Sequence, residues 1–187
     1  MADHVILVGT MGSGKTSVGG ALARELGLEF IDLDQKVSAE HGPIPAIFAA
    51  GGEAAFRALE AQALLDALGA ERAVIATGGG TVLQPGNRAA VTGRTVVYLR
   101  IDRATAAQRL AGDTNRPMLA SGPDPLTAWE RLAEVRTPVY QELATHTIDA
   151  GSGTPQQLAH RIAELLPGDP GHQHPSLVQT PTEEHRA

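Results

Sequence analysis

The feature that most constrains this chain is the glycine-rich segment GTMGSGKT at residues 9–16. It fits the pattern G-x-x-x-x-G-K-[ST] at every fixed position, follows an apolar run from Val5 to Val8, and leads into a helical apolar pattern that begins at Val18. Strand, loop and helix in this order are the context that a phosphate-binding loop requires. The alternative is an ordinary glycine-rich turn before a helix, which would not require the lysine and threonine or the preceding strand.

The residue types of the segment explain how it would hold phosphate. Glycines let the backbone wrap an anion with its N–H groups, and the following helix adds its free N-terminal donors and the positive end of its dipole. Lys15 would reach the β and γ phosphates of a triphosphate, and the hydroxyl of Thr16 would bind the Mg²⁺ that bridges them. The residues of the loop that we expect to bind ATP are Gly12, Ser13, Gly14, Lys15, Thr16 and Ser17.

Composition limits the other possibilities. With 187 residues the chain can form one well-cored domain, for which we expect residues 1–166, followed by a disordered tail at 167–187. The chain has no cysteine, and its net charge of −6 argues against a general nucleic-acid or membrane-surface partner. No signal peptide or apolar run of about 20 residues is apparent, so we expect a cytoplasmic protein. We also expect it to act as a monomer.

Five short apolar runs alternate with helical patterns and predict the fold class. The expected strands are Val5 to Val8, Phe30-Ile31, Ala73 to Ala76, Thr95 to Leu99 and, more weakly, Thr145 to Ile148. The alternation predicts an α/β fold with a five-stranded, largely parallel sheet between helical layers. Ligands bind at the carboxyl ends of such strands, so candidate site residues are sought just after each strand.

Two carboxylates, Asp32 and Asp34, stand where the second expected strand ends. If this segment is still extended, both side chains point to one side and could act as a pair, one toward the metal and one toward a substrate hydroxyl. The alternative is that they are turn or cap residues. Asp102, after the fourth strand, is a rival acid, although its place before a helix favours a cap.

The third strand runs directly into Gly78, Gly79 and Gly80, which allow a ligand to approach main-chain N–H groups. This turn is a second candidate binding loop. Further back, a turn at Gly51-Gly52 leads into a long amphipathic helix in which Arg57 and Glu60, at i and i+3, fit an exposed ion pair.

Two more arginines lie in segments that suit a cleft. Residues 112–123 are polar and broken by proline and glycine, which suits a mobile lid that brings Arg116 onto phosphates, or merely a flexible surface loop. Arg136 precedes Thr137-Pro138, and we expect a helix break there. Pro155 is expected to open the last helix.

Together these residues make the chain resemble the shikimate kinase family over residues 4 to about 166. The motifs that carry the resemblance are GTMGSGKT, FIDLD, FRALE, TGGG, RPML and RTPVY. The phosphate loop by itself would name only a superfamily, whereas the acidic pair, FRALE and the glycine triplet are far more specific. The resemblance implies a nucleoside-monophosphate-kinase-like fold, with a substrate-binding segment at about 33–60 and a lid at about 112–123.

The resemblance also implies an activity, the transfer of the γ-phosphoryl group of ATP to the 3-hydroxyl of shikimate in aromatic amino acid biosynthesis. In this reading Asp34 holds the ring hydroxyls and accepts the proton, with Lys15 and Arg116 as further catalytic residues, and Asp32 binds Mg²⁺ through water. Arg109 stacks on adenine, near Pro155. The remaining shikimate-binding residues are Phe48, Phe56, Arg57, Gly78, Gly79, Gly80 and Arg136.

Three other classes of protein share part of this sequence pattern. A gluconate-type sugar-acid kinase would share the phosphate loop and the small size. A GTPase would need an Asn-Lys-x-Asp segment, which neither Lys15 nor Lys36 provides, because they follow Gly14 and Gln35. An ATP-binding module without catalysis would leave the acidic pair and the separate arginines unexplained.

Overall fold

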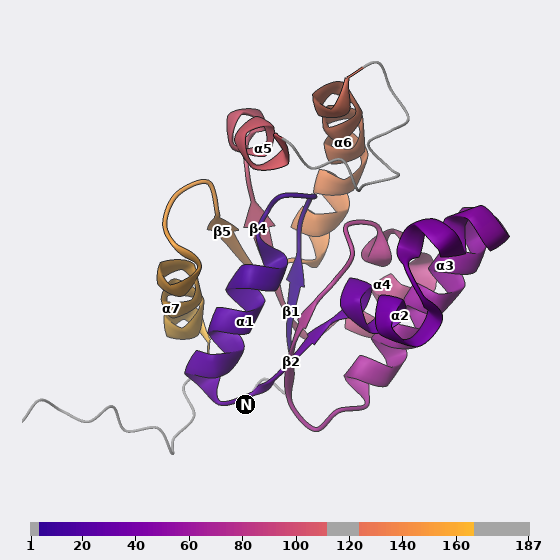
Figure 1. Ribbon diagram of the computed structural model, residues 1–187. Coiled ribbons are helices and arrows are strands. Elements are labelled where there is room, and N and C mark those ends of the chain that lie inside the picture. Colours follow the sequence, from indigo (N-terminus) through magenta and orange to yellow (C-terminus); the bar gives the residue numbers. More distant parts are fainter. Residues whose placement is uncertain (1–3, 112–123, 167–187) are drawn as a thin grey trace, which may run out of the picture.

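The computed structural model describes residues 4–111 and 124–166 and is built around one sheet (Figure 1). The strand order is β2-β3-β1-β4-β5, and all neighbouring strands are parallel. The strands are β1 (His4–Val8), β2 (Glu29–Asp32), β3 (Ala73–Ala76), β4 (Thr95–Arg100) and β5 (His146–Asp149). The predicted five-stranded parallel sheet is confirmed.

Helices cover both faces of the sheet. They are α1 (Lys15–Leu26), α2 (Leu33–His41), α3 (Ile44–Leu68), α4 (Pro85–Val91), α5 (Arg103–Leu110), α6 (Pro125–Leu143) and α7 (Pro155–Leu165), with a short 3-10 helix, η1 (Thr81–Leu83). In Figure 1, α1 and α7 lie on one side of the sheet and α2, α3 and α4 on the other. No helix in the described ranges is both long and apolar enough to cross a membrane.

The central strand β1 shows why the sheet is a middle layer. All five of its residues are buried, as is typical of a parallel strand covered on both faces. Successive side chains of a strand point to opposite faces. Val5 and Leu7 therefore join the core formed with α1, α5 and α7, whereas Ile6 and Val8 join the core formed with α2, α3 and α4.

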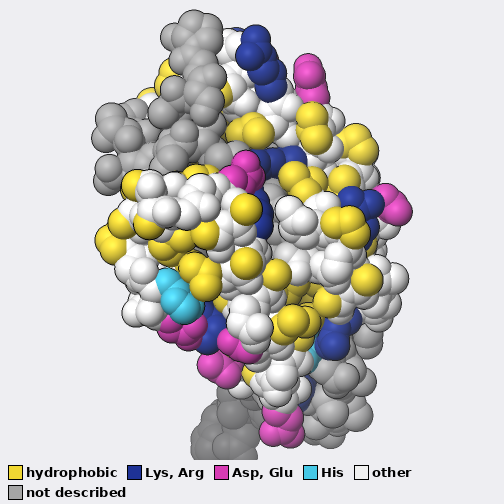
Figure 2. All heavy atoms as spheres, turned by 90° about the vertical axis from the view of Figure 1, so that its right-hand side faces the viewer, with side chains coloured by type: hydrophobic (Ala, Val, Ile, Leu, Met, Phe, Trp, Pro, Cys, Tyr) yellow, Lys and Arg dark blue, Asp and Glu magenta, His cyan; other side chains and the backbone are white. Residues whose placement is uncertain are grey.

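The face formed by α2, α3 and α4 carries its surface groups in a mixed pattern. Figure 2 shows this face, with apolar side chains dispersed among polar ones and with acidic and basic groups next to one another. Lys36, for example, pairs with Glu40 at 2.5 Å, four residues further along α2. Such exposed pairs contribute little to stability, so the fold depends on the two cores.

The predicted turn before the long amphipathic helix lies within α3. Gly52 has φ 70° and ψ −171°, a conformation that interrupts the helix and that glycine adopts without steric cost. The part of α3 before Gly52 carries Phe48, and the part after it carries Phe56 and Arg57. The interruption lets these two parts approach the same cavity from different directions.

The predicted helix break after Arg136 is wrong, because α6 continues through Pro138 to Leu143. Proline removes one helical hydrogen bond, to the carbonyl of Glu134. Both Pro138 and Glu134 are exposed, so water can bind that carbonyl. On the opposite side Arg136 and Tyr140 are buried, and this burial holds the helix together across the proline.

Two adjacent glycines of α1 give a test of this packing. A Cβ on Gly19 would lie 2.5 Å from Cε2 of Phe30 and 3.1 Å from Cδ1 of Leu7, whereas one on Gly20 would meet no atom closer than 3.8 Å. We expect Gly19→Ala to lower the free energy of unfolding by about 1–3 kcal/mol through overpacking. The matched Gly20→Ala should raise it by about 0.5–1 kcal/mol, because alanine favours helix. Denaturant unfolding measures both, and equal effects would contradict the packing described.

Candidate active site

A cavity of about 490 Å³ lies at the carboxyl ends of β1, β2 and β3. Its walls come from the phosphate-binding loop, the start of α2, both parts of α3, the turn after β3, and α6. The predicted site residues that line it are Gly12, Gly14, Lys15, Thr16, Ser17, Asp32, Asp34, Phe48, Phe56, Arg57, Gly78, Gly79, Gly80 and Arg136. The fold thus brings the predicted nucleotide loop and all the predicted acceptor residues to one place.

The phosphate-binding loop forms one wall of the cavity. Gly14 caps α1 in the left-handed region, with φ 90°, a conformation that side chains with a Cβ rarely adopt. Lys15, the first helical residue, donates from Nζ to the carbonyls of Gly9 at 2.9 Å and Thr10 at 3.0 Å. Ser13 is fully buried, and its hydroxyl has no hydrogen-bond partner among the described residues. The loop therefore presents the N-terminus of α1 and one ammonium group to the cavity.

Asp32 connects this loop to the second strand. As the last residue of β2, it accepts a hydrogen bond from Thr16 Oγ1 at 2.6 Å with one carboxylate oxygen. With the other oxygen it accepts from the backbone N–H of Gln35 at 3.1 Å and so caps α2. The cap expected from the sequence is confirmed, and the carboxylate of Asp32 also lies beside Thr16, whereas its binding of Mg²⁺ stays a prediction.

Asp34 is not extended, as the pairing argument assumed, but is the second residue of α2. Its side chain is exposed to the cavity, yet the surrounding walls remove enough water to raise its pKa to about 6. The carboxylates of Glu60 and Asp32 add to this rise, and Lys15 and Arg57 oppose it. Asp34 is therefore a carboxyl group that can change its protonation state near neutral pH.

The turn after β3 brings backbone close to three different charged groups. A Cβ on Gly78 would overlap Glu60 Oε1, one on Gly79 would lie 2.9 Å from Arg136 Nη1, and one on Gly80 would lie 2.5 Å from Arg57 Nη2. Any side chain here would push an acidic or basic group away. The three glycines are thus required by the close approach of the protein's own charged side chains, and the hypothesis that a ligand binds to their N–H groups stays a prediction.

Arg57 is held by two carboxylates rather than forming an exposed pair. Its Nη1 donates to Glu60 Oε2 at 2.7 Å, and its Nε and Nη2 donate to Glu53 Oε1 at 3.2 and 3.1 Å. The ion pair expected between Arg57 and Glu60 is confirmed, but only 13% of the Arg57 side chain and 1% of the Glu60 side chain are exposed, so the expectation that the pair is exposed is wrong. These bonds fix the guanidinium at the cavity wall.

Arg136 approaches the same turn from the opposite side. It comes from α6, is only 5% exposed, and its Nε has no hydrogen-bond partner among the described residues. A buried guanidinium group with unused donor capacity favours an anionic ligand with a planar pair of oxygens. Arg57 and Arg136 thus converge on Gly79 and Gly80 and could together hold a carboxylate.

An apolar wall stands next to these arginines. The rings of Phe48 and Phe56 lie 5.0 Å apart at a tilt of 34°, and the Arg57 guanidinium lies 5.3 Å from the centre of the Phe56 ring. Both rings line the cavity. They offer an apolar surface to a small ring-shaped ligand, beside charged groups that could fix its orientation.

The predicted adenine-side residues lie outside this cavity. Arg109 donates to the carbonyl of Gly12 at 3.1 Å and to that of Ala150 at 2.6 Å, and so links the phosphate loop to the segment that precedes α7. Pro155 is the first residue of α7. Asp102 caps α5 by accepting from Thr105 N at 2.8 Å, which lowers its pKa and settles its role as a cap. Arg116 and the predicted lid lie outside the described residues.

Sequence reasoning missed several residues of the site. Glu60 lies in the apolar stripe of α3, together with Phe56, Ala63 and Leu64, and this helical spacing was the available signal that its carboxylate is buried. Glu53, Thr81 and Tyr140 were also missed. Tyr140 follows Arg136 by four residues and so lies on the same face of α6. Nothing in the sequence indicated the role of Thr81.

Comparison with known proteins places the chain among kinases of small molecules. A family model described as shikimate kinase matches residues 11–167. The shikimate kinase of Salinispora arenicola is 46% identical over 167 residues, which cover 89% of this chain and 99% of the relative. The solved shikimate kinase of Acinetobacter baumannii in complex with shikimate has a TM-score of 0.84 and 38% identity, covering 88% of this chain and 93% of that one.

More distant structures share the fold alone. A gluconokinase from Sinorhizobium meliloti 1021 has a TM-score of 0.58 and 21% identity, covering 88% of this chain and 95% of that one. Its similarity supports the parallel α/β architecture with helices on both faces. It carries no information on which acceptor the present chain uses.

Proposed function

Since the chain belongs to the shikimate kinase family, which transfers the γ-phosphoryl group of ATP to the 3-hydroxyl of shikimate, we propose roles for its residues in that reaction. The observation that carries the proposal is the convergence of Arg57 and Arg136 on the glycine turn, in the same cavity as the phosphate-binding loop. Asp34 lines that cavity as well. This arrangement suits an acceptor with a carboxylate at one end and a hydroxyl at the other.

The nucleotide side of the reaction depends on positioning and charge neutralisation. In the proposal the backbone N–H groups of the loop and the Lys15 ammonium bind the phosphates. Lys15 then exchanges its bonds to the carbonyls of Gly9 and Thr10 for phosphate oxygens. Arg109, fixed beside Gly12, is proposed to stack on adenine near Pro155. Arg116 remains a prediction from the sequence.

The residues around Thr16 fit Mg²⁺. A hydroxyl and a carboxylate, Thr16 Oγ1 and Asp32 Oδ2, lie 2.6 Å apart on the cavity wall, and oxygen ligands are those that Mg²⁺ prefers. Among the described residues, no group of three or more His, Cys, Asp or Glu side chains is placed to hold a metal, so we propose phosphate oxygens and water as the other ligands. When bound, the ion neutralises charge on the phosphates.

Removing the Thr16 hydroxyl tests this metal site. We expect Thr16→Val to raise the Mg²⁺ concentration that gives the half-maximal rate by on the order of tenfold or more. Thr16→Ser keeps the hydroxyl and should stay close to the unaltered enzyme. Initial rates at fixed ATP over a range of free Mg²⁺ measure the effect. An unchanged Mg²⁺ requirement in the valine variant would remove Thr16 from the proposed ligands.

The acceptor side orients the hydroxyl toward the phosphates. Asp34, at the start of α2, is proposed to hold the ring hydroxyls and to accept the proton of the attacking 3-hydroxyl. Arg57 and Arg136 hold the carboxylate with planar pairs of N–H groups, with help from the backbone of Gly79 and Gly80. Holding both ends of the acceptor converts the transfer into a step between oriented partners.

The same site supports two further proposals. Described residues of one chain supply both the nucleotide and the acceptor walls of the cavity, and we propose that the enzyme acts as a monomer, with residues 1–166 as one catalytic domain. We also propose a cytoplasmic location, where its co-substrate ATP is available. Sedimentation of the full chain at the concentration used for assays tests the first of these.

One assay tests the acceptor. ADP release with Mg-ATP should be fast with shikimate and remain at the background rate with gluconate or without an acceptor. Gluconate is the discriminating choice because a gluconokinase shares the fold. Turnover with gluconate and none with shikimate would overturn the assignment. ADP release that does not depend on any acceptor would instead indicate an ATPase.

A further inference from the structure

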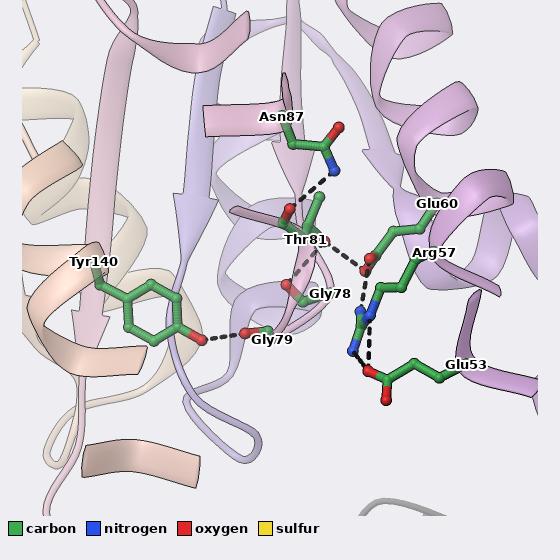
Figure 3. A network of polar contacts seen from close by, with 8 residues as sticks. All are labelled: Glu53, Arg57, Glu60, Gly78, Gly79, Thr81, Asn87 and Tyr140. Atoms are coloured by element: carbon green, nitrogen blue, oxygen red, sulfur yellow. Dashed lines mark hydrogen bonds and ion pairs between the residues drawn. The ribbon is translucent and has the colours of Figure 1, made fainter. Parts of the chain in front are cut away.

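The glycine turn is held from two sides by residues that do not line the cavity (Figure 3). Tyr140, from α6, donates its phenolic proton to the carbonyl of Gly79. Thr81, the first residue of η1, donates its backbone N–H to the carbonyl of Gly78 at 3.3 Å, and its Oγ1 lies 3.0 Å from the same carbonyl. The carbonyls of Gly78 and Gly79 therefore both have partners outside the cavity.

Thr81 also reaches the Arg57 side of the site. Its hydroxyl donates its one proton to Glu60 Oε1 at 2.6 Å, the nearer of its two acceptors, and the other oxygen of Glu60 accepts from Arg57 Nη1 at 2.7 Å. Thr81 and Glu60 are 0% and 1% exposed, so water does not replace these bonds. Asn87, from α4, donates to the carbonyl of Thr81 at 2.9 Å and fixes its backbone. The orientation of Arg57 thus depends on the Thr81 hydroxyl through Glu60.

Tyr140 lies beside Arg136 in the way that Thr81 lies beside the Arg57–Glu60 pair. It follows Arg136 by one helical turn, and both side chains approach Gly79: a Cβ on that glycine would lie 2.9 Å from Arg136 Nη1 and 3.8 Å from the Tyr140 hydroxyl. Tyr140 is completely buried, and this burial raises its pKa well above the usual range. The phenol therefore keeps its proton and stays a donor to Gly79 at neutral pH.

We propose that Thr81 and Tyr140 are positioning residues, whose hydroxyls fix the Arg57 and Arg136 guanidinium groups relative to the glycine turn so that the substrate's carboxylate meets a preformed site. This inference rests on the proposed function, because it takes that turn as the carboxylate site. Neither hydroxyl contacts the substrate. In this proposal Thr81 acts through Arg57 of α3, and Tyr140 acts through Arg136 of its own helix, α6.

Two isosteric replacements test the proposal. Thr81→Val and Tyr140→Phe each remove one hydroxyl and keep the shape of the side chain. We expect each to raise the KM for shikimate roughly two- to tenfold, the effect of one lost hydrogen bond, with the KM for ATP and kcat nearly unchanged. Thr81→Ser, which keeps the hydroxyl, should restore most of the affinity. Thr92→Val, which removes an exposed hydroxyl on the end of α4, is the matched control.

Double variants separate positioning from general stabilisation. If Thr81 acts through Arg57, then Thr81→Val should add little to the KM of Arg57→Ala, although both raise it separately. Tyr140→Phe should likewise add little to Arg136→Ala. A lower Tm with an unchanged KM for shikimate would show that the hydroxyl only stabilises the fold, and this result would overturn the proposal. If one of the two isosteric variants fails to fold, the KM of the other is sufficient to test the positioning role.

The arginine variants also separate this inference from the proposed function. If Arg57→Ala and Arg136→Ala leave the KM for shikimate unchanged, the assignment of the carboxylate site fails. If they raise the KM while Thr81→Val and Tyr140→Phe do not, only the positioning role fails.

Discussion

Replacing Asp34 with asparagine is expected to lower kcat by on the order of 10²-fold or more, within the range of general acid–base catalysis. The variant keeps the size and shape of the side chain but cannot accept the proton of the 3-hydroxyl. Because asparagine can still bind the ring hydroxyls, the KM for shikimate should change much less than kcat. Steady-state rates of ADP release at saturating shikimate measure the loss. Near-normal turnover would exclude Asp34 as the base.

The pH dependence gives an independent test of the same group. The pKa of Asp34 is raised to about 6, chiefly by loss of surrounding water and then by the carboxylates of Glu60 and Asp32. A base must be ionised, so kcat/KM for the unaltered enzyme should fall as the pH decreases through about 6. The residual rate of Asp34→Asn should lack this acidic limb. An unchanged limb would assign the titration to another group.

Asp34→Asn also has an expected effect on stability that separates catalysis from misfolding. The folded protein favours the protonated form of Asp34, because the pKa rises from 3.8 in the unfolded chain to about 6. Stability therefore decreases as the pH rises between these values, and at pH 7 the ionised group disfavours folding. Asparagine removes this effect, so the variant should have a higher Tm at pH 7. A lower Tm would suggest that the inactive variant is damaged.

The second large effect is expected for Arg136→Ala. Truncation of this buried guanidinium should reduce kcat/KM for shikimate by about 2–5 kcal/mol of transition-state stabilisation, the range for breaking a buried charged pair. The KM for ATP should change little, because Arg136 lies at the glycine turn. Arg131→Ala, at an exposed position of the same helix, is the matched control. Unchanged kinetics in Arg136→Ala would remove the residue from the site.

Much of the architecture could be predicted from the sequence because local pattern and burial agree in it. The buried residues 5–8 of β1 and 96–99 of β4 are all apolar, and the glycine-rich loop stands between β1 and α1, where its motif requires it. The caps of α5 and α7, Asp102 and Thr154, accept backbone N–H groups in the usual way. Elements of this kind depend on near neighbours in the chain.

The errors concern residues whose state depends on distant contacts. Pro138 favours a break by its own chemistry, but the burial of Arg136 and Tyr140 keeps α6 continuous. The charge of Glu60 suggests an exposed position, and only the partners Arg57 and Thr81 explain why it is buried. Arg57 is 3 residues from Glu60, and helical spacing in the sequence could indicate this partner. Thr81 is 21 residues from Glu60, and no sequence spacing indicates that contact.

The only tryptophan of the chain provides an optical probe of the nucleotide loop. Trp129 is buried at the start of α6, and its indole N–H donates to the carbonyl of Met11 at 2.9 Å. Indole emission responds to the polarity and the hydrogen bonding around the ring. When ATP binds, a change in the loop at Met11 should therefore alter the fluorescence of an unlabelled enzyme, whereas shikimate, which we propose to bind at the glycine turn, should affect it less. A single natural fluorophore could thus report the occupancy of one substrate separately from the other.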